Sequence, residues 1–421
     1  MSKKPSKGGA PALDMTPMVD LAFLLVTFFM LTASFRMAEP VVVDPPSSIG
    51  TVDLPDNHIM VTIDNNGRAF FGISNTTAKI AALREMAKRY KVQFTEEQVK
   101  KFSGLPSFGV DIKDLPKYID AKEEARLKFQ PQKGVPLDTI TPNNQLKDWI
   151  NIGGTEAVRV YQAAKEKAAE SGAEFKAEKP RYAIKCAAQT KYIFVKDVIK
   201  TFTDLKLYQF NLITSLEGGG EKKGGKKRAK KQSTRIDMTP MVDLAFLLLT
   251  FFVLTATFNK PKSMELTFPA PPPPDQKIEE VKKGITFLLS KDNRIFYYEG
   301  QFRAAADDKG AATTLTELSF DQSSLHKYLL EKNKEMDDKV KALTEKKDKK
   351  QLEDTTYKRM VREVKADKNS YTYLIKTDDQ ATYKNVIDVI DELNYFVVGK
   401  YVMVDIMKSE FDLVKAKIGT N

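Results

Sequence analysis

Residues 14–35 read DMTPMVDLAFLLVTFFMLTASF, and residues 237–258 read DMTPMVDLAFLLLTFFVLTATF. The two stretches differ only at the pairs Val26/Leu249, Met30/Val253 and Ser34/Thr257. At about 1.5 Å per residue, each apolar run matches a bilayer core of about 30 Å. Each run also carries one acid, Asp20 or Asp243. We therefore predict two membrane helices and interpret the rest of the chain as their flanks.

Composition limits what the flanks can be. The chain has 421 residues, of which 29% are charged, with a net charge of +11 and a mean hydropathy of −0.38. Most of it is therefore expected to face water. Basic residues gather before each apolar run, at Lys3, Lys4 and Lys7 and then at Lys222, Lys223, Lys226, Lys227, Arg228, Lys230, Lys231 and Arg235. Because no aromatics interleave with them, we predict the positive-inside pattern and no nucleic-acid partner.

Residues that commonly carry enzyme chemistry are sparse. Cys186 is the single cysteine, and His58 and His326 lie far apart in the sequence. An intrachain disulfide is therefore excluded, and a zinc site or a Ser-His-Asp triad is poorly supported. We predict no metal, no cofactor and no enzymatic activity.

The composition shifts along the chain divide it into eight parts. Proline-rich stretches follow both apolar runs, and a Gly/Lys-rich stretch without apolar residues precedes the second run. Such stretches are typical of extended spacers and flexible linkers. We predict a cytoplasmic tail (1–13), transmembrane helix (14–36), stalk (37–57), periplasmic domain (58–216), basic linker (217–236), transmembrane helix (237–259), Pro-rich stalk (260–282) and periplasmic domain (283–421).

In the first predicted periplasmic domain, alternating apolar strands flank the turn Asp64-Asn-Asn-Gly67, which predicts a hairpin of residues 59–63 and 68–71. A helix is expected over 78–90, and residues 91–145 are expected to be loops with one short helix. Residues 146–169 are expected to be helical in part, with a break at Gly153-Gly154 and Trp149 in the core. The domain is expected to end in a strand, a helix and a strand, at 182–186, 192–202 and 208–213.

The second predicted periplasmic domain follows a similar plan. A hairpin is expected at 285–289 and 294–298, followed by a charged helical stretch at 322–350. The domain is then expected to end in a strand, a helix and a closing strand, at 371–376, 383–390 and 396–404. Strands 208–213 and 396–404 are expected to have exposed edges that could accept a strand from a partner.

The ends of the two domains also align in sequence. Residues 184–192 read IKCAAQTKY, and residues 375–383 read IKTDDQATY. The first half holds extra residues, which we place in 91–145, and it has Ala187-Ala188 where the second has Asp378-Asp379. The predicted fold class is therefore α+β, with two copies of a single transmembrane helix followed by a small periplasmic α/β domain, each a hairpin plus a β-α-β unit with a right-handed parallel crossover.

A polar stripe follows one face of each predicted membrane helix. At 100° per residue, the acid shares its face with small hydroxyl residues, namely Thr16, Thr27 and Ser34 around Asp20, and Thr239, Thr250 and Thr257 around Asp243. A charged carboxylate at bilayer depth costs about 2.5–3.5 kcal/mol on insertion scales, so it should face a partner or a wet cavity. This arrangement is typical of a proton relay.

A second interpretation of these acids stays open. Thr16-Pro17 forms an N-cap and N1 pair, which places Asp20 in the first turn of the helix. An acid in that position interacts favourably with the helix dipole and needs no further role.

At these residues the chain resembles the ExbD/TolR family of biopolymer-transport proteins. The family motif Asp-x-Thr-Pro-x-x-Asp matches Asp14, Thr16, Pro17 and Asp20, and it matches again at Asp237, Thr239, Pro240 and Asp243. The resemblance implies two ExbD-like copies in tandem. It also implies that Asp20 and Asp243 are the residues of proton translocation.

The resemblance further implies partners and a location. An ExbD-type subunit is expected in the bacterial inner membrane, as single-pass units with periplasmic domains, inside a ring of an ExbB/TolQ-type polytopic protein. It would act as a pair of parallel helices and energise TonB-dependent outer-membrane transport through a TonB-like periplasmic protein. The alternative is a TolR-like anchored module that binds peptidoglycan or another envelope partner.

The duplication creates a conflict of topology. Both apolar runs have basic residues on their N-terminal side, so both favour that end in the cytoplasm. No third apolar run lies between them to restore the direction of the chain. We expect two parallel helices from separate or processed pieces, with an inverted second half as the alternative.

Overall fold

The computed structural model describes most of the chain outside the apolar runs. The described residues are 23, 39–48, 52–122, 125–126, 134–138, 144–172, 174–175, 177–216, 262–267, 283–304, 311–320, 324–349, 351–365, 370–396 and 398–419. The predicted segments 14–36 and 237–259 lie outside them, apart from Phe23. We call residues 39–216 the first copy and residues 283–419 the second copy.

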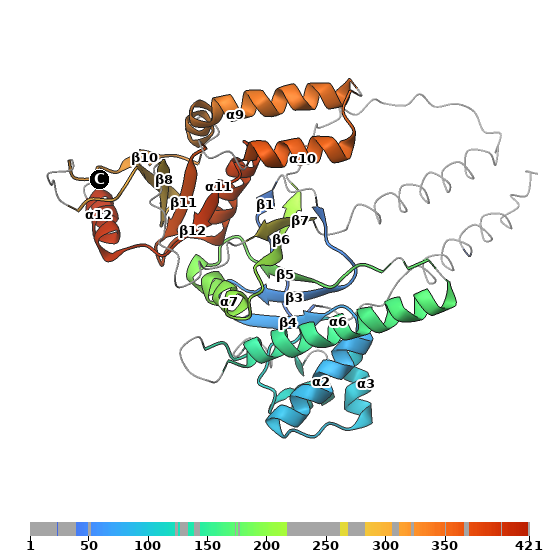
Figure 1. Cartoon of the computed structure of the whole chain (residues 1–421). Helices are drawn as coiled ribbons and strands as arrows, with labels where there is room; N and C mark the ends of the chain where they lie inside the picture. Colours follow the sequence, from blue (N-terminus) through green and yellow to red (C-terminus); the bar gives the residue numbers. More distant parts are fainter. Residues whose placement is uncertain are drawn as a thin grey trace, which may run out of the picture. The chain divides into compact units, whose positions relative to one another are not determined.

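The sheet of the first copy includes one strand that comes from later in the chain (Figure 1). Its order is β2-β7-β6-β5-β3-β4, and β1 pairs with the end of β6. Strand β7 follows the second apolar run in sequence and pairs antiparallel with β6. The bounds are β1 Ser47–Ser48, β2 Val52–Asp53, β3 His58–Ile63, β4 Ala69–Ile73, β5 Arg181–Cys186, β6 Gln209–Leu216 and β7 Lys262–Thr267.

Local sequence explains the centre of this sheet. Strands β3 and β4 form the expected antiparallel hairpin around Asp64–Gly67. Gly67 has φ +79 and packs beneath the Phe194 ring, so a side chain there would be strained and would collide. Strands β5 and β6 are parallel and are joined by helix α7 (Tyr192–Asp204). This confirms the predicted strand-helix-strand unit, because α7 buries the apolar face that its spacing predicted, at Val195, Val198, Ile199 and Phe202.

Helices cover the hairpin side of the first sheet, and here the prediction for residues 91–145 is wrong. The described residues of this region include helices α3 (Glu96–Gly104) and α4 (Leu115–Asp120), and they contribute Phe102 and Phe108 to the core. Phe108 also pairs through its backbone with Phe71 of β4. Thr95 and Gln98 form a capping box at the start of α3. The predicted helix at 78–90 is confirmed as α2 (Thr76–Tyr90).

The long helix of this region is continuous. Helix α6 runs from Gln145 to Ser171 without the break predicted at Gly153-Gly154. A methyl group at Gly154 would collide with the Tyr182 hydroxyl, so the glycine allows the helix to pack closely on the sheet. Close packing thus explains the glycine pair better than a break does. Trp149 is fully buried, as predicted.

The second copy has a sheet of its own, in the order β10-β9-β8-β11-β12. The predicted hairpin is confirmed as β8 (Gly284–Ser290) and β9 (Arg294–Glu299), and the strand predicted at 396–404 shortens to β12. Helix α11 joins the parallel strands β11 and β12, whereas α10 and α12 were not predicted. The remaining bounds are β10 Thr316–Leu318, β11 Thr372–Thr377, β12 Tyr401–Met403, α9 Leu325–Asp348, α10 Asp354–Lys365, α11 Tyr383–Tyr395 and α12 Lys408–Gly419.

The predicted fold class, two copies of a single transmembrane helix followed by a small periplasmic α/β domain, is wrong for this structure. None of the helices in the described ranges has the length and apolar content to cross a membrane. The two copies are also not self-contained, because β7 belongs in sequence to the second half and in space to the first sheet. The described chain is a mixed α/β fold with two sheets.

Candidate functional site

The two copies meet along a seam made of equivalent residues. The Tyr192 N–H donates to the Ala381 carbonyl, and the Tyr383 N–H donates to the Thr190 carbonyl, both at 2.8 Å. In the matched motifs of the two copies, Thr190 corresponds to Ala381 and Tyr192 to Tyr383. The two bonds are therefore reciprocal, as in a two-fold dimer interface. We call residues 188–192 and 381–384 the seam.

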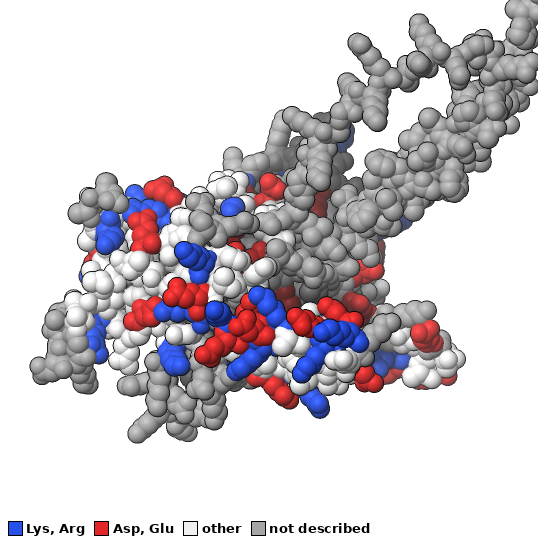
Figure 2. All heavy atoms as spheres, turned by 90° about the horizontal axis from the view of Figure 1, so that it is seen from above, with Lys and Arg blue, Asp and Glu red and all other residues white. Residues whose placement is uncertain are grey.

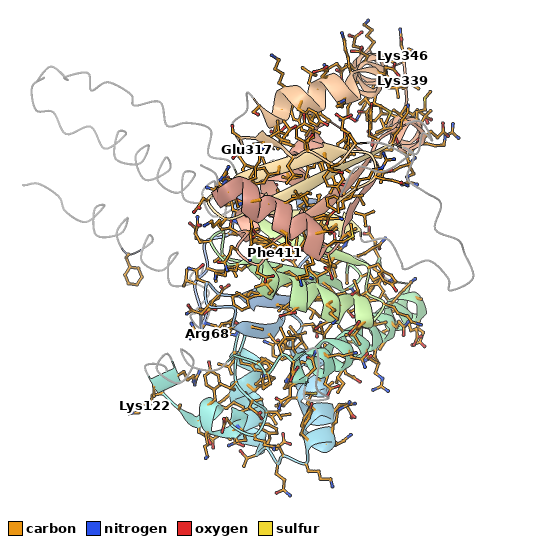
Figure 3. The ribbon with its side chains drawn as sticks, turned by 90° about the vertical axis from the view of Figure 1, so that its left-hand side faces the viewer. Arg68, Lys122, Glu317, Lys339, Lys346 and Phe411 are labelled. Atoms are coloured by element: carbon orange, nitrogen blue, oxygen red, sulfur yellow. The ribbon has the colours of Figure 1, made fainter. Side chains whose placement is uncertain are left out.

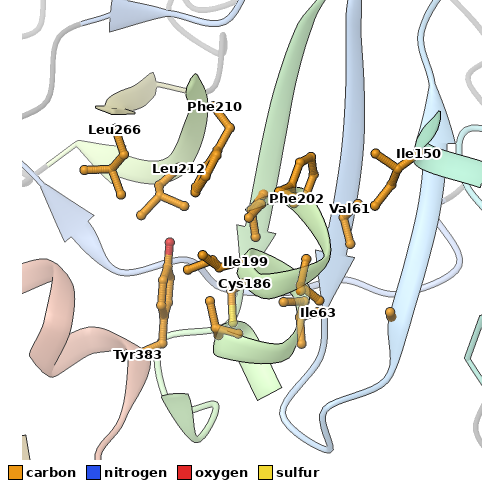
Figure 4. Close-up of a cluster of buried hydrophobic side chains, with 14 of the residues drawn as sticks. Val61, Ile63, Ile150, Cys186, Ile199, Phe202, Phe210, Leu212, Leu266 and Tyr383 are labelled. Atoms are coloured by element: carbon orange, nitrogen blue, oxygen red, sulfur yellow. The ribbon is translucent and has the colours of Figure 1, made fainter. Parts of the chain in front are cut away.

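The seam tyrosine of each copy packs against the other copy. Tyr383 is fully buried and points its hydroxyl toward Leu212 and Leu266 in the core of the first copy (Figure 4). Tyr192 is buried and donates to the Met403 sulfur of the second copy at 3.4 Å. Burial raises the pKa of both tyrosines, so both stay neutral and act as packing anchors.

The seam is not fully symmetric. Asn211 of β6 and Val402 of β12 pair with equivalent residues of the neighbouring strands β5 and β11. The residues that follow them, Leu212 and Met403, are therefore equivalent too. The Tyr383 hydroxyl consequently has no hydrogen-bond partner among the described residues. A buried hydroxyl without a partner destabilises the fold by about 1–3 kcal/mol. Beside it, burial raises the pKa of the Cys186 thiol to about 12, so this cysteine is an inert core residue.

A buried ion pair fixes helix α12 to the outer face of the second sheet. The Lys376 ammonium lies 2.6 Å from Glu410 Oε1, and Glu410 is fully buried. The Tyr298 hydroxyl donates to the same oxygen at 2.5 Å, and the Met407 N–H donates to the other oxygen at 2.8 Å. Burial and the bond to Glu410 raise the pKa of Tyr298. The apolar face of α12 completes the contact, with Val414 buried against Leu288 and Phe296.

The first copy has the matching lysine in a different setting. Lys185 occupies in β5 the register position that Lys376 occupies in β11, one residue before the last residue of the strand. Lys185 pairs with Glu39 at 2.8 Å, and the Glu39 side chain is 48% exposed. Glu39 precedes the first strand of the chain. The equivalent lysine therefore holds the segment before β1 in one copy and helix α12 in the other.

The buried acid at this end of the sheet follows a different strand in each copy. Asp378 follows β11 and accepts from the Ser290 hydroxyl and from the N–H groups of Gln380 and Ala381. The first copy has Ala187 there, but it has the buried Asp64 after the neighbouring strand β3. Asp64 accepts from the Arg68 N–H at 2.8 Å and from the Arg68 side chain at 2.6 Å. In both copies, one buried acid therefore closes the turn at this end of the sheet.

The residues predicted for proton transfer lie outside the described part of the chain, so their role stays a prediction. They are Asp20 and Asp243. The polar-stripe residues Thr16, Thr27, Ser34, Thr239, Thr250 and Thr257 and the helix-start residues Asp14, Pro17, Asp237 and Pro240 also lie outside the described residues. The sequence reasoning did not assign roles to Lys185 and Lys376, although both stand in the matched motifs. Glu39 and Glu410 lie far from those motifs in sequence, and no local signal marked them.

The remaining surface carries charges of both signs and a groove between two helices. Acidic and basic side chains are interspersed over the face seen in Figure 2. A groove of about 470 Å³ lies between α9 and α10, with Lys339 and Lys346 on its rim (Figure 3). Phe411 on α12 carries the Lys415 ammonium over its ring. Within the described ranges, no group of three or more histidine, cysteine and acidic side chains is placed to bind a metal.

The fold and the seam thus define an internal pseudo-dimer of two related α/β units. The family model described as "Biopolymer transport protein ExbD/TolR" matches residues 6–217 and again residues 229–404. The chain therefore belongs to the ExbD/TolR family, and the two matches fit a tandem duplication. This confirms the family and the duplication predicted from the motif.

A curated relative agrees with the family model. The chain is 26% identical over 98 residues to the biopolymer transport protein exbD2 of Vibrio cholerae serotype O1, a match that covers 23% of this chain and 68% of the relative. No solved structure matches the chain. The chain is accordingly a motor-associated component of biopolymer transport, and not an enzyme.

Proposed function

We propose that the chain is an ExbD-type subunit of a proton-driven motor in the bacterial inner membrane. In this proposal Asp20 and Asp243 carry protons inside a ring of an ExbB/TolQ-type protein and thereby energise TonB-dependent outer-membrane transport. The other polar residues of the two apolar segments would line the proton path. ExbD/TolR proteins are in general associated with the inner membrane and work with such partners, which supports the proposal.

The reciprocal seam carries this proposal. An ExbD-type subunit is expected to act as a pair, and here one chain supplies two copies of the unit. The bonds between Tyr192 and Ala381 and between Tyr383 and Thr190 join equivalent positions, as expected of a pair that functions together. Each copy is preceded by one apolar segment with one acid, so the pair would deliver two proton carriers to one ring.

Substitution of the two acids tests the proposal. The double variant Asp20→Asn, Asp243→Asn is expected to abolish energised uptake while the complex with the polytopic partner still assembles. Uptake would be measured in cells with the proton gradient intact, and assembly by co-purification from membranes. Asp292→Asn, which changes an exposed acid in the β8–β9 turn, serves as the matched control. Normal uptake in the double variant would reject proton transfer at these residues.

The alternative function is a TolR-like module that binds peptidoglycan or an envelope partner. The edge of the second sheet favours it. Strand β12 pairs only with β11 in the described part of the chain, whereas its counterpart β6 is flanked by β5 and β7. The prediction of an exposed edge at 208–213 is therefore wrong, and of the two predicted edges the one at β12 stays open to a partner strand within the described residues.

The two functions separate in one comparison. If binding is the whole function, the double asparagine variant keeps activity, and Tyr401→Pro in β12, whose N–H faces away from β11, removes it by blocking strand addition. If proton transfer is the function, the double asparagine variant is inactive whatever happens at β12. Co-purified partners would show whether a polytopic membrane protein or an envelope component follows the chain.

A further inference from the structure

The segments that lead from the two apolar runs into the fold converge on one sheet. We call residues 39–53 and 262–267 the leading segments. The first is held by Glu39 to Lys185 and by β1 along β6. The second forms β7 on the outer edge of β6, and the two meet each other through β2 and β7. Both leading segments are therefore bound to the first copy.

The second copy contacts both leading segments through helix α11. The Ser48 hydroxyl donates to Asp391 Oδ1 at 2.8 Å, and the Asn394 amide donates to the Met264 sulfur at 3.6 Å. Asp391 and Asn394 stand three residues apart, so they share one face of the helix. One face of α11 thus meets Ser48 of the first leading segment and Met264 of the second.

The far end of α11 leads directly to the edge of the second sheet. The Val398 N–H donates to the Leu393 carbonyl at 2.9 Å, and the Lys400 carbonyl accepts from Tyr373 of β11 at 2.9 Å. Strand β12 begins at the next residue. Leu393, Phe396 and Val398 are buried in the main core. Because this core is close-packed, a shift of α11 must be transmitted to β12 or be resisted there.

We propose that α11 is a relay that couples both leading segments to the edge strand β12, with Asp391 and Asn394 as its positioning residues. A displacement of either leading segment would then change the order of β12. In this relay the first copy binds the leading segments, and β12 of the second copy responds to their displacement. The coupling is a property of the folded chain, and only its effect on transport rests on the proposed function.

Hydrogen exchange in the full-length protein tests the relay by a double-mutant cycle. Ser48→Ala and Asp391→Ala each remove the first contact, and each is expected to raise amide exchange in β12 about tenfold. The double variant should exchange about as fast as the faster single variant, because both substitutions break one link. Asp391→Asn keeps the acceptor oxygen and should restore slow exchange. Asp388→Asn, which changes an acid that pairs with Lys384 on the same helix, is the matched control.

Two results would overturn the relay. One is additive effects of Ser48→Ala and Asp391→Ala in β12, and the other is a change in β12 that Asp388→Asn reproduces. Transport gives a second readout, in which Ser48→Ala is expected to lower energised uptake. Asp20→Asn with Asp243→Asn should abolish uptake and leave exchange in β12 unchanged. Failure of the proposed function would therefore appear in uptake alone, and failure of the relay in the exchange data.

Discussion

The two copies place a lysine at the same register of the central strand and surround it differently. Lys376 has a side chain 6% exposed, and its partner Glu410 is fully buried beneath α12. Lys185 is 18% exposed, and its partner Glu39 is 48% exposed in a leading segment. The strand therefore supplies the charge, whereas the element that covers the sheet decides how strongly that charge contributes to stability.

The largest expected effect comes from breaking the buried pair. Lys376→Met leaves Glu410 buried without its cation, and removal of one partner of a buried pair typically costs about 3–5 kcal/mol. We expect the free energy of unfolding to fall by that amount in urea titrations. We also expect α12 to become accessible to protease before the rest of the fold.

A compensating variant controls for lost packing. Lys376→Met combined with Glu410→Leu removes both charges and should recover part of the stability, because apolar residues can replace a buried pair at little cost, whereas the Tyr298 hydroxyl loses its acceptor. If the double variant is as unstable as Lys376→Met, the loss comes from packing, and the comparison between the two lysines fails.

Lys79 of α2 shows what a buried lysine does without a carboxylate. Its ammonium donates to the carbonyls of Leu105 and Ser103, and burial lowers its pKa from 10.5 to about 8. The unfolded chain binds this proton more tightly, so the charged lysine costs the folded state about 3 kcal/mol below pH 8. This cost disappears as the pH rises from 8 to 10.5.

The stability of the first copy should therefore rise with pH in that window. Lys79→Met is expected to remove this part of the pH dependence, and the two lost hydrogen bonds offset the gain from removing the buried charge below pH 8. Chemical unfolding at several pH values between 7 and 10.5 would measure both. An identical pH dependence in wild type and Lys79→Met would contradict the lowered pKa.

The asymmetry of the seam predicts a gain in stability. Tyr383→Phe removes a buried hydroxyl that has no partner among the described residues and should stabilise the fold by about 1 kcal/mol. Tyr192→Phe loses the contact with the Met403 sulfur and should not stabilise it. Thermal unfolding of the two variants side by side measures the difference.

A substitution on the other side of the seam sharpens the test. Leu212→Met places a sulfur where the second copy has Met403, so it should stabilise the wild type and have no such effect in Tyr383→Phe. Equal effects in both backgrounds would mean that the Tyr383 hydroxyl is not the cause.

Local patterns predicted the elements whose residues act on near neighbours. The two hairpins and helix α7 follow from turn residues and apolar spacing, and all three are confirmed. Helix α6 could not be predicted as continuous, because the reason for Gly154 is its packing on Tyr182 from another element. Strand β12 is also shorter than predicted. The length of a strand depends on its neighbours in the sheet, such as β7 beside the equivalent strand β6, and the local sequence does not reveal them.

The site was less accessible to sequence reasoning. The matched motifs contain Lys185 and Lys376, but the glutamates that pair with them come from opposite ends of the folded chain. The pairing of β7 with β6 likewise depends on an open edge at β6, which exists only once the first copy has folded. Motif spacing identified the family, and long-range packing determined how the two copies differ.

The smallest effect is expected at the exposed pair. Glu39→Gln should change the free energy of unfolding by less than about 1 kcal/mol, because an ion pair open to water gains little from Coulomb attraction. The same change should shrink further in high salt, where exposed charges are screened. Unfolding in low and high salt, with Lys376→Met as the reference, measures the contrast. A loss as large as that of Lys376→Met, or one that salt does not reduce, would mean that Glu39 becomes buried when the leading segment is bound. The two lysines would then form equivalent buried pairs, and the copies would differ only in the element that covers the sheet.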